Sequence, residues 1–313
     1  MRKTFRYRLL PTKSQRTKLD PTLELCRWVY NETLATRKRA WEREQKSLSL
    51  YGTNKLLTLW KAARPELNEV YSQVLQNVQE RVDLAFQAFF RRVKAGHQNG
   101  YPRFKGYGRY DSFTFKPYGF GFKAPQNGRL NLSKIGSIKI RLHRLIEGEI
   151  KTLTLQRDRV GNWYACFSCV VEPKPLPVSP QVIGIDVGLS KFAALSTGES
   201  ISIPSFLKRD EADLKRIQRK LSKLDQGTPQ RHKAIKALNH VHIRIKHRRS
   251  DFAHKQSQQL INKYQIICFE DLDIQDMQHH GNKRINKSIA DVAWAQFVNM
   301  TTGKAEEAGR LVI

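Results

Sequence analysis

The sequence predicts a multidomain α/β protein, and three observations support this. Residues 12–94 carry apolar side chains at helical spacing, whereas residues 96–175 contain alternating, strand-like runs. Two short apolar runs, Val182–Asp186 and Gln265–Glu270, then flank a long basic helical region, and each run ends in an acid. Strands that alternate with helices are typical of an open α/β sheet. The length of 313 residues fits about two domains.

The chain opens with an expected strand, Arg2–Leu10, which ends at Pro11. Its apolar and basic side chains alternate, with Phe5, Tyr7 and Leu9 on one face and Arg2, Arg6 and Arg8 on the other. One face should therefore be buried and the other basic, and we count Arg6 and Arg8 among the candidate nucleic-acid contacts.

Helices are expected from residue 12 to about residue 94. The apolar positions that recur every three or four residues are Leu19, Leu23, Cys26, Val29 and Tyr30, and later Val74, Val78, Val82, Ala85 and Phe89. Two interpretations stay open for this helical domain. It is either a small bundle whose charged residues form a solvated face, or a basic wall along a nucleic-acid duplex.

An aromatic, glycine-rich segment follows between Gly96 and Phe122. Aromatic faces can stack on unpaired bases while neighbouring cations hold the backbone. On that ground the candidate nucleic-acid contacts include Tyr101, Arg103, Phe104, Lys105 and Arg109. For Phe113 and Phe115, burial in a strand is an equal alternative.

The next segments have the alternation of strands and suggest a β-barrel-like or sheet domain. They are Ser137–Leu142, Glu149–Gln156 and Trp163–Val171. Cys166 and Cys169 form a C-x-x-C pair within the last strand, but no second pair completes a set of four zinc ligands, so we favour packing. The proline-rich stretch 173–180 is expected to be a linker.

A meander of short strands begins at Val182–Asp186 and is followed by a basic helical hairpin over residues 211–264, interrupted near Gly227. The outer faces of the hairpin are crowded with cations, and the candidate contacts there are Arg244, Lys246, Arg248 and Arg249. A further helix is expected from about residue 291 to residue 308.

Charge points to a polyanionic partner. The chain has 56 Lys plus Arg against 28 Asp plus Glu, a formal net charge of +28. Each cation that neutralises a phosphate releases counterions, so DNA or RNA is the first candidate partner. No apolar run is long enough to span a membrane, and the first residues lack the apolar core of a secretory signal. We therefore expect no membrane partner and a cytoplasmic protein.

Asp186 and Glu270 are the candidate catalytic and metal-binding residues. Open α/β sheets bind ligands at the carboxyl ends of their strands, where both acids lie. Clustered carboxylates hold Mg²⁺, and a pair of such ions can support phosphodiester cleavage. The alternative is that each acid merely ends its strand in solvent, and spacing leaves both interpretations open.

Several sequence blocks resemble the OrfB or TnpB family of insertion-sequence proteins, often labelled transposases, and they follow one another along the chain in the family's order. The segment Gly184–Gly198 resembles the family's first RuvC motif. The other blocks are Gly100–Lys105, His247–Lys255, Phe269–Leu272, Ser288–Trp294 and Lys304–Arg310. The resemblance covers nearly the whole chain, and the ordered combination is far more specific than any one block.

The resemblance implies an RNA-guided DNA endonuclease with a guide RNA and double-stranded target DNA as partners, found at the nucleoid when bound to DNA. It implies a wedge-like β domain over 1–10 and 96–175, a helical recognition domain over 11–95 and a linker over 176–180. An RNase H-like (RuvC) nuclease domain with a mixed sheet and a helical insertion would span 181–313. Base pairing would then read the target sequence, and protein would read a short flanking motif. Carried over by position, Asp186 matches the first catalytic acid and Glu270 the second.

One departure from the family pattern concerns the third acid. Family members continue into a four-cysteine zinc ribbon and a further catalytic Asp, and neither follows Ile313 in this sequence. The two-metal Mg²⁺ site thus lacks its third ligand acid here, and Zn²⁺ is expected only with such a ribbon. The absent acid leaves open a nuclease-inactive RNA-guided DNA-binding repressor, and the family's usual label leaves open a DNA-joining transposase.

Overall fold

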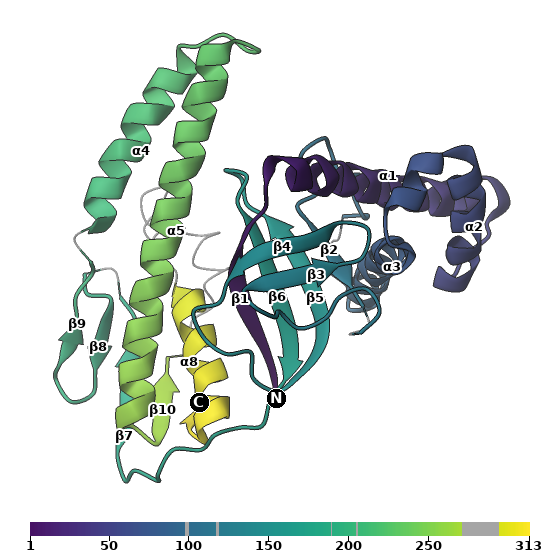
Figure 1. Ribbon diagram of the computed structural model, residues 1–313. Coiled ribbons are helices and arrows are strands. Elements are labelled where there is room, and N and C mark those ends of the chain that lie inside the picture. Colours follow the sequence, from purple (N-terminus) through teal and green to yellow (C-terminus); the bar gives the residue numbers. More distant parts are fainter. Residues whose placement is uncertain (98–99, 117–118, 189, 205, 271–293) are drawn as a thin grey trace. The chain divides into compact units, whose positions relative to one another are not determined.

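A computed structural model describes the chain except for residues 98–99, 117–118, 189, 205 and 271–293, and the side chains of 206–209. The chain divides into two compact units, Arg2–Val171 and Glu172–Ile313 (Figure 1). The predicted mixture of helices and strands is confirmed. In the described part of the chain, every helix is either too short or too polar to cross a lipid bilayer.

Helices fill the first half of the N-terminal unit, as predicted. They are α1 (Lys13–Glu44), α2 (Leu50–Ala63), the 3-10 helix η1 (Pro65–Glu69) and α3 (Ser72–Lys94). Thr12 begins α1 with a capping box, since its hydroxyl accepts from the Gln15 amide and the Gln15 side chain accepts from the Thr12 amide.

The set of buried residues in the second half of α3 differs from the prediction. Val74, Val78 and Val82 are buried as expected, but the next buried position is Phe86, at 5% exposure. Ala85 and Phe89 are only half-buried. A helix completes a turn in 3.6 residues, so positions 74, 78, 82 and 86, four residues apart, stay on one side of α3 for about three turns. Positions 85 and 89 lie at the margin of that buried side.

An antiparallel sheet of six strands completes this unit, in the order β2-β5-β6-β1-β4-β3 (Figure 1). The strands are β1 (Arg2–Leu10), β2 (Ser112–Phe115), β3 (Arg129–Leu132), β4 (Gly136–Arg141), β5 (Glu149–Arg157) and β6 (Trp163–Val170). The buried face of β1 carries Phe5, Tyr7 and Leu9, each at most 1% exposed. Phe113 and Phe115 are equally buried, so they pack in the core.

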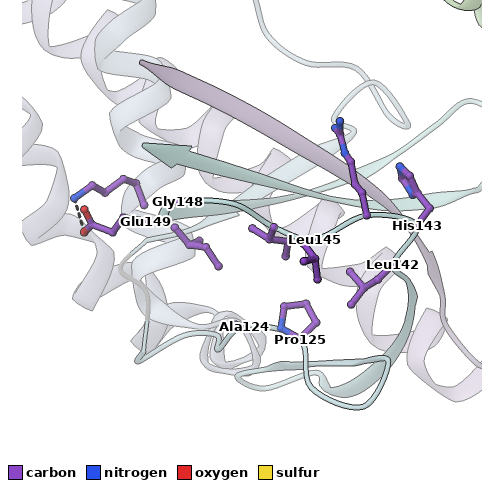
Figure 2. A pocket seen from close by; sticks show the side chains of 11 residues that line it. Ala124, Pro125, Leu142, His143, Leu145, Gly148 and Glu149 are labelled. Atoms are coloured by element: carbon purple, nitrogen blue, oxygen red, sulfur yellow. Dashed lines mark hydrogen bonds and ion pairs between the residues drawn. The ribbon is translucent and has the colours of Figure 1, made fainter. Parts of the chain in front are cut away.

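A cavity of about 1000 Å³ lies beside the loop between β4 and β5 (Figure 2). Its lining is largely apolar: Ala124, Pro125, Leu142, Leu145, Ile146 and Ile150, with His143, Arg144, Gly148, Glu149 and Lys151. Leu145 is 85% exposed. Neither of the two candidate catalytic acids lines this cavity.

The C-terminal unit contains a mixed sheet in the order β11-β10-β7-β8-β9. Its strands are β7 (Val182–Asp186), β8 (Ala193–Leu195), β9 (Ser200–Ile201), β10 (Ile266–Phe269) and β11 (Leu311–Val312). The strands β7, β10 and β11 are parallel, whereas β7, β8 and β9 form the predicted antiparallel meander.

Three helices accompany this sheet: α4 (Phe206–Ser222), α5 (Pro229–Lys263) and α8 (Trp294–Ala308). The helices α4 and α5 form the predicted hairpin (Figure 1). Phe192, Trp294 and Phe297 are central to the buried core of the unit. The proline-rich connector is held to the end of α8, because the amides of Lys174 and Leu176 donate to Glu307 and Ala308 at 2.9 Å.

Candidate functional site

Asp186 and Glu270 lie beside each other at the carboxyl ends of adjacent parallel strands. Ile185 of β7 pairs with Phe269 of β10, and the Glu270 amide donates to the Ile185 carbonyl at 3.3 Å. Parallel neighbours end at the same edge of a sheet, so residues that follow matched positions project from that edge together. The expected approach of the two acids is therefore present in the structure.

The two side chains form a hydrogen bond, and both residues are exposed. This hydrogen bond with Asp186 is the main cause that raises the pKa of the Glu270 carboxyl, followed by desolvation and by the charge of Asp186. The negative charge of Asp186 disfavours the ionisation of Glu270, because like charges repel. A divalent cation bound by both carboxylates would relieve this repulsion.

Packing beneath the acids fixes the strands that carry them. Phe192, in the loop after β7, meets Phe297 of α8 edge to face with ring centroids 5.1 Å apart. Phe269, which precedes Glu270, also meets Phe297, at 5.6 Å. The hydroxyl of Ser196 accepts from the Gly184 amide at 3.0 Å, two residues before Asp186. Both acids thus extend from backbone that is held on several sides.

A pair of carboxylates fits a hard divalent cation, which prefers oxygen ligands. Among the described residues no group of three His, Cys, Asp or Glu side chains gathers at one point. Three further acids that the sequence offers, Asp271, Asp273 and Asp291, lie outside the described residues.

Comparison with known proteins identifies the family. Residues 166–280 match the OrfB_IS605 model, described as a probable transposase, and residues 1–46 match a helix-turn-helix model of the same family. A relative from Streptomyces pristinaespiralis, named "Putative RNA-guided DNA endonuclease", is 35% identical over all of this chain and 77% of its own length. The chain belongs to the OrfB (TnpB) family.

Two more similarities agree with this OrfB assignment. A relative from Escherichia coli (strain K12), named "Putative RNA-guided DNA endonuclease InsQ", is 28% identical over 94% of this chain and 75% of its own length. The fold is similar to that of Cas12f1, solved by cryo-EM as a complex with sgRNA and target DNA. That match has a TM-score of 0.57 at 14% identity and covers 96% of this chain and 72% of the solved one.

The candidate contacts on β1 of this OrfB chain rest on an aromatic side chain. The Arg6 guanidinium lies 3.7 Å from the centre of the Tyr164 ring, and Arg8 donates to the Tyr164 hydroxyl at 3.1 Å. Both arginines are half-buried. Stacking of this kind fixes the orientation of the Arg6 guanidinium and leaves its edge for an anion, whereas Arg8 also donates to the Asn162 side chain.

The predicted contacts in the aromatic loop are exposed, and two of them are anchored to the helices. Tyr101 meets Phe86 and Phe89 edge to face at 5.3 and 5.6 Å. The backbone of Lys105 is held by the Asn31 side chain, which donates to its carbonyl and accepts from its amide. All members of the predicted set are exposed, with Tyr101 at 40% and Phe104 at 53%; the others are Arg103, Lys105 and Arg109.

In the helical hairpin, two predicted contacts have partners within the protein. Asp210, 1% exposed on α4, accepts from Arg244 at 3.1 Å and from Arg248 at 2.7 Å. Arg244 also pairs with Asp213. Lys246 is exposed and Arg249 half-buried. Sequence reasoning missed these acids, although their spacing of three on an otherwise basic helix was the available indication.

Proposed function

We propose that this chain is an RNA-guided DNA endonuclease that hydrolyses phosphodiester bonds at Asp186 and Glu270. The supporting observation is the contact between these two acids at the ends of β7 and β10. The names of the two relatives and the nucleic acids in the solved Cas12f1 complex point to the same function. A single sheet edge with paired, exposed carboxylates is the arrangement that such chemistry requires.

The two carboxylates would hold Mg²⁺, with Asp186 presented from β7 and Glu270 from β10. When bound, the ion stabilises the negative charge that develops on the phosphodiester. The role of the protein is to keep the two acids together at the sheet edge, and the buried rings of Phe192 and Phe297 support the backbone for that role. The exposure of both acids leaves room for a nucleic-acid strand.

The remaining parts would bind and position the nucleic acids. We assign residues 181–313 to an RNase H-like nuclease domain, joined by residues 176–180 to a wedge-like domain over 1–10 and 96–175. Residues 11–95 would form a recognition domain for a guide RNA paired with its DNA target. The net charge of +28 suits the many phosphates of a guide and its target.

The decisive experiment compares Asp186→Asn with Asp225→Asn, an exposed acid in the turn between α4 and α5. The full chain is expressed with its flanking DNA, the co-purified RNA is sequenced, and a plasmid with a matching target is offered in Mg²⁺. We expect Asp225→Asn to cut and Asp186→Asn to bind without cutting. Equal cutting by both variants would reject the assignment.

A readout without cleavage separates metal binding from catalysis. Added Mg²⁺ should raise the melting temperature of the unchanged chain and of Asp225→Asn, because a ligand that binds only the folded state stabilises it. Glu270→Gln and Asp186→Asn should show much smaller increases. If all of these proteins respond alike, the two acids do not hold the ion.

Two other functions are outcomes of the same assay. Target binding without any scission in Mg²⁺ by the unchanged chain would indicate an RNA-guided repressor. The family description as a probable transposase favours DNA joining, which would produce strand-transfer products.

A further inference from the structure

A cluster of four aromatic rings forms at the end of α3 in the N-terminal unit. Tyr101, from the segment after this helix, contacts the rings of Phe86 and Phe89. Phe90 contacts the same two rings, with centroids 6.1 Å from Phe86 and 5.3 Å from Phe89. Phe90 and Tyr101 therefore share both of their ring neighbours, although they come from different segments.

This cluster has a fixed base and an exposed side. Phe86 is 5% exposed, and the Arg37 guanidinium of α1 lies 4.4 Å from the centre of its ring. Arg37 is held in turn by Asp83 at 2.7 Å. Phe90 and Tyr101, in contrast, are 51% and 40% exposed. Two exposed rings thus stand on a buried base, which fixes their position before any partner binds.

The segment that carries these rings is basic. Residues 84–110 contain six Lys or Arg and no Asp or Glu. Lys94 follows Phe90 by four residues, so both side chains extend from the same side of α3. Lys94 and Arg91 are exposed, and among the described residues neither forms an ion pair with a carboxylate. Exposed rings and cations without an acidic partner therefore lie together at this end of the helix.

Charge decides which partner fits this surface. A second copy of the chain would bring the same cations into the contact, and a net charge of +28 opposes self-association. A single nucleic-acid strand offers both flat base faces for the rings and phosphates for the cations. Glu42, an acid of α1 whose charge acts on Tyr101, is paired with Lys38 at 3.5 Å and so adds little negative charge here.

We propose that Phe90 and Tyr101 form a platform on which an unpaired base of a nucleic-acid strand stacks, while Lys94 binds a backbone phosphate of that strand. A base inside a duplex is covered by its neighbours, so the platform selects single-stranded segments. The inference rests on the proposed nucleic-acid partners but not on Asp186 and Glu270. A chain that binds strands in this way and never cuts would refute the nuclease assignment alone.

The test measures the affinity of the full chain, washed free of nucleic acid at high salt, for three probes. They are a single-stranded RNA, a DNA strand of the same sequence and an abasic DNA strand of the same length. Phe90→Leu removes the ring, Phe90→Tyr keeps it, and Lys94→Gln removes the charge. The matched control is Leu84→Ala, because Leu84 is 54% exposed on another side of α3.

The ring and the charge should have different signatures. Phe90→Leu should weaken binding to the base-containing strands by about 5- to 150-fold, the effect of one lost stacking ring, without changing the salt dependence. Phe90→Tyr should bind like the unchanged chain. Lys94→Gln should instead reduce the slope of log affinity against log salt by about 0.7. On the abasic strand, Phe90→Leu should have no effect, and the strand with the larger loss identifies the partner as RNA or DNA.

Melting temperatures establish that each variant is folded, and Tyr101→Leu replaces Phe90→Leu if the latter is not. The proposal is overturned if Phe90→Leu binds the base-containing strands as well as Leu84→Ala does, or if it weakens the abasic strand equally. It is also overturned if Phe90→Leu changes only the sedimentation of the free protein, since the rings would then contact a second copy.

Discussion

Replacing Arg310 by methionine should destabilise the C-terminal unit through a buried polar network. Arg310 is 9% exposed and donates to the carbonyls of Ile261 at 3.2 Å and Pro177 at 2.8 Å. It also donates to the side chain of Gln265, which lies directly before β10. One guanidinium therefore ties together the end of α5, the connector and the strand that leads to Glu270.

The magnitude follows from these three acceptors. A hydrogen bond to a charged group contributes about 1.5–3 kcal/mol, and bonds that share one donor group are not additive. Methionine keeps most of the buried stem, so we expect Arg310→Met to lower the free energy of unfolding by about 3–4 kcal/mol. Arg310→Lys should lose less, because one ammonium group keeps part of the network.

Hydrogen exchange of the amides in β10 and at the end of α5 measures this loss locally in the full chain. The comparison is Lys304→Met, since Lys304 donates to a single carbonyl, that of His254, at 2.6 Å. If Arg310→Met loses no more than Lys304→Met, the network does not hold the strand in the way described.

Two more predictions concern the N-terminal unit. Gly148 and Gly96 share a φ of 73°, but only at Gly148 would a Cβ meet a backbone atom, the Val170 carbonyl oxygen at 2.1 Å. In urea unfolding, Gly148→Ala should therefore lose about 1–3 kcal/mol more than Gly96→Ala, and equal losses would contradict the contact. Burial raises the pKa of the Cys26 thiol from 9.0 to about 12, so the folded state keeps a proton that the unfolded state releases. Stability should then fall as pH rises from 9.0 towards 12, and Cys26→Ala should unfold with a smaller dependence on pH.

Much of the fold followed from local pattern. Alternation in Arg2–Leu10 predicted both the strand and its buried face, and the spacing in residues 12–94 predicted the helices. The errors were also local in origin. After Val82, the next residue on the buried side of a helix can follow at a step of three or four, and spacing alone does not choose between the two. The pattern therefore predicts burial of Ala85 and Phe89, whereas Phe86 is the buried residue.

Arg244 and Arg248 show what a pattern of charges does not tell. They were predicted as nucleic-acid contacts because they crowd one face of a basic helix. In the structure they hold Asp210, which lies on the preceding helix. Phosphate binding stays a prediction for both arginines, and a phosphate would have to compete with the Asp210 carboxylate for them.

The sequence by itself determined the element types, the strong positive charge and the two strands that end in Asp186 and Glu270. Side-chain alternation, helical period and charge are properties of successive residues, so they are visible without a fold. Only the tertiary structure decided that β7 and β10 are neighbours in matching register, which brings Asp186 and Glu270 into contact. Those contacts join residues far apart in the chain, because they depend on which buried faces pack together.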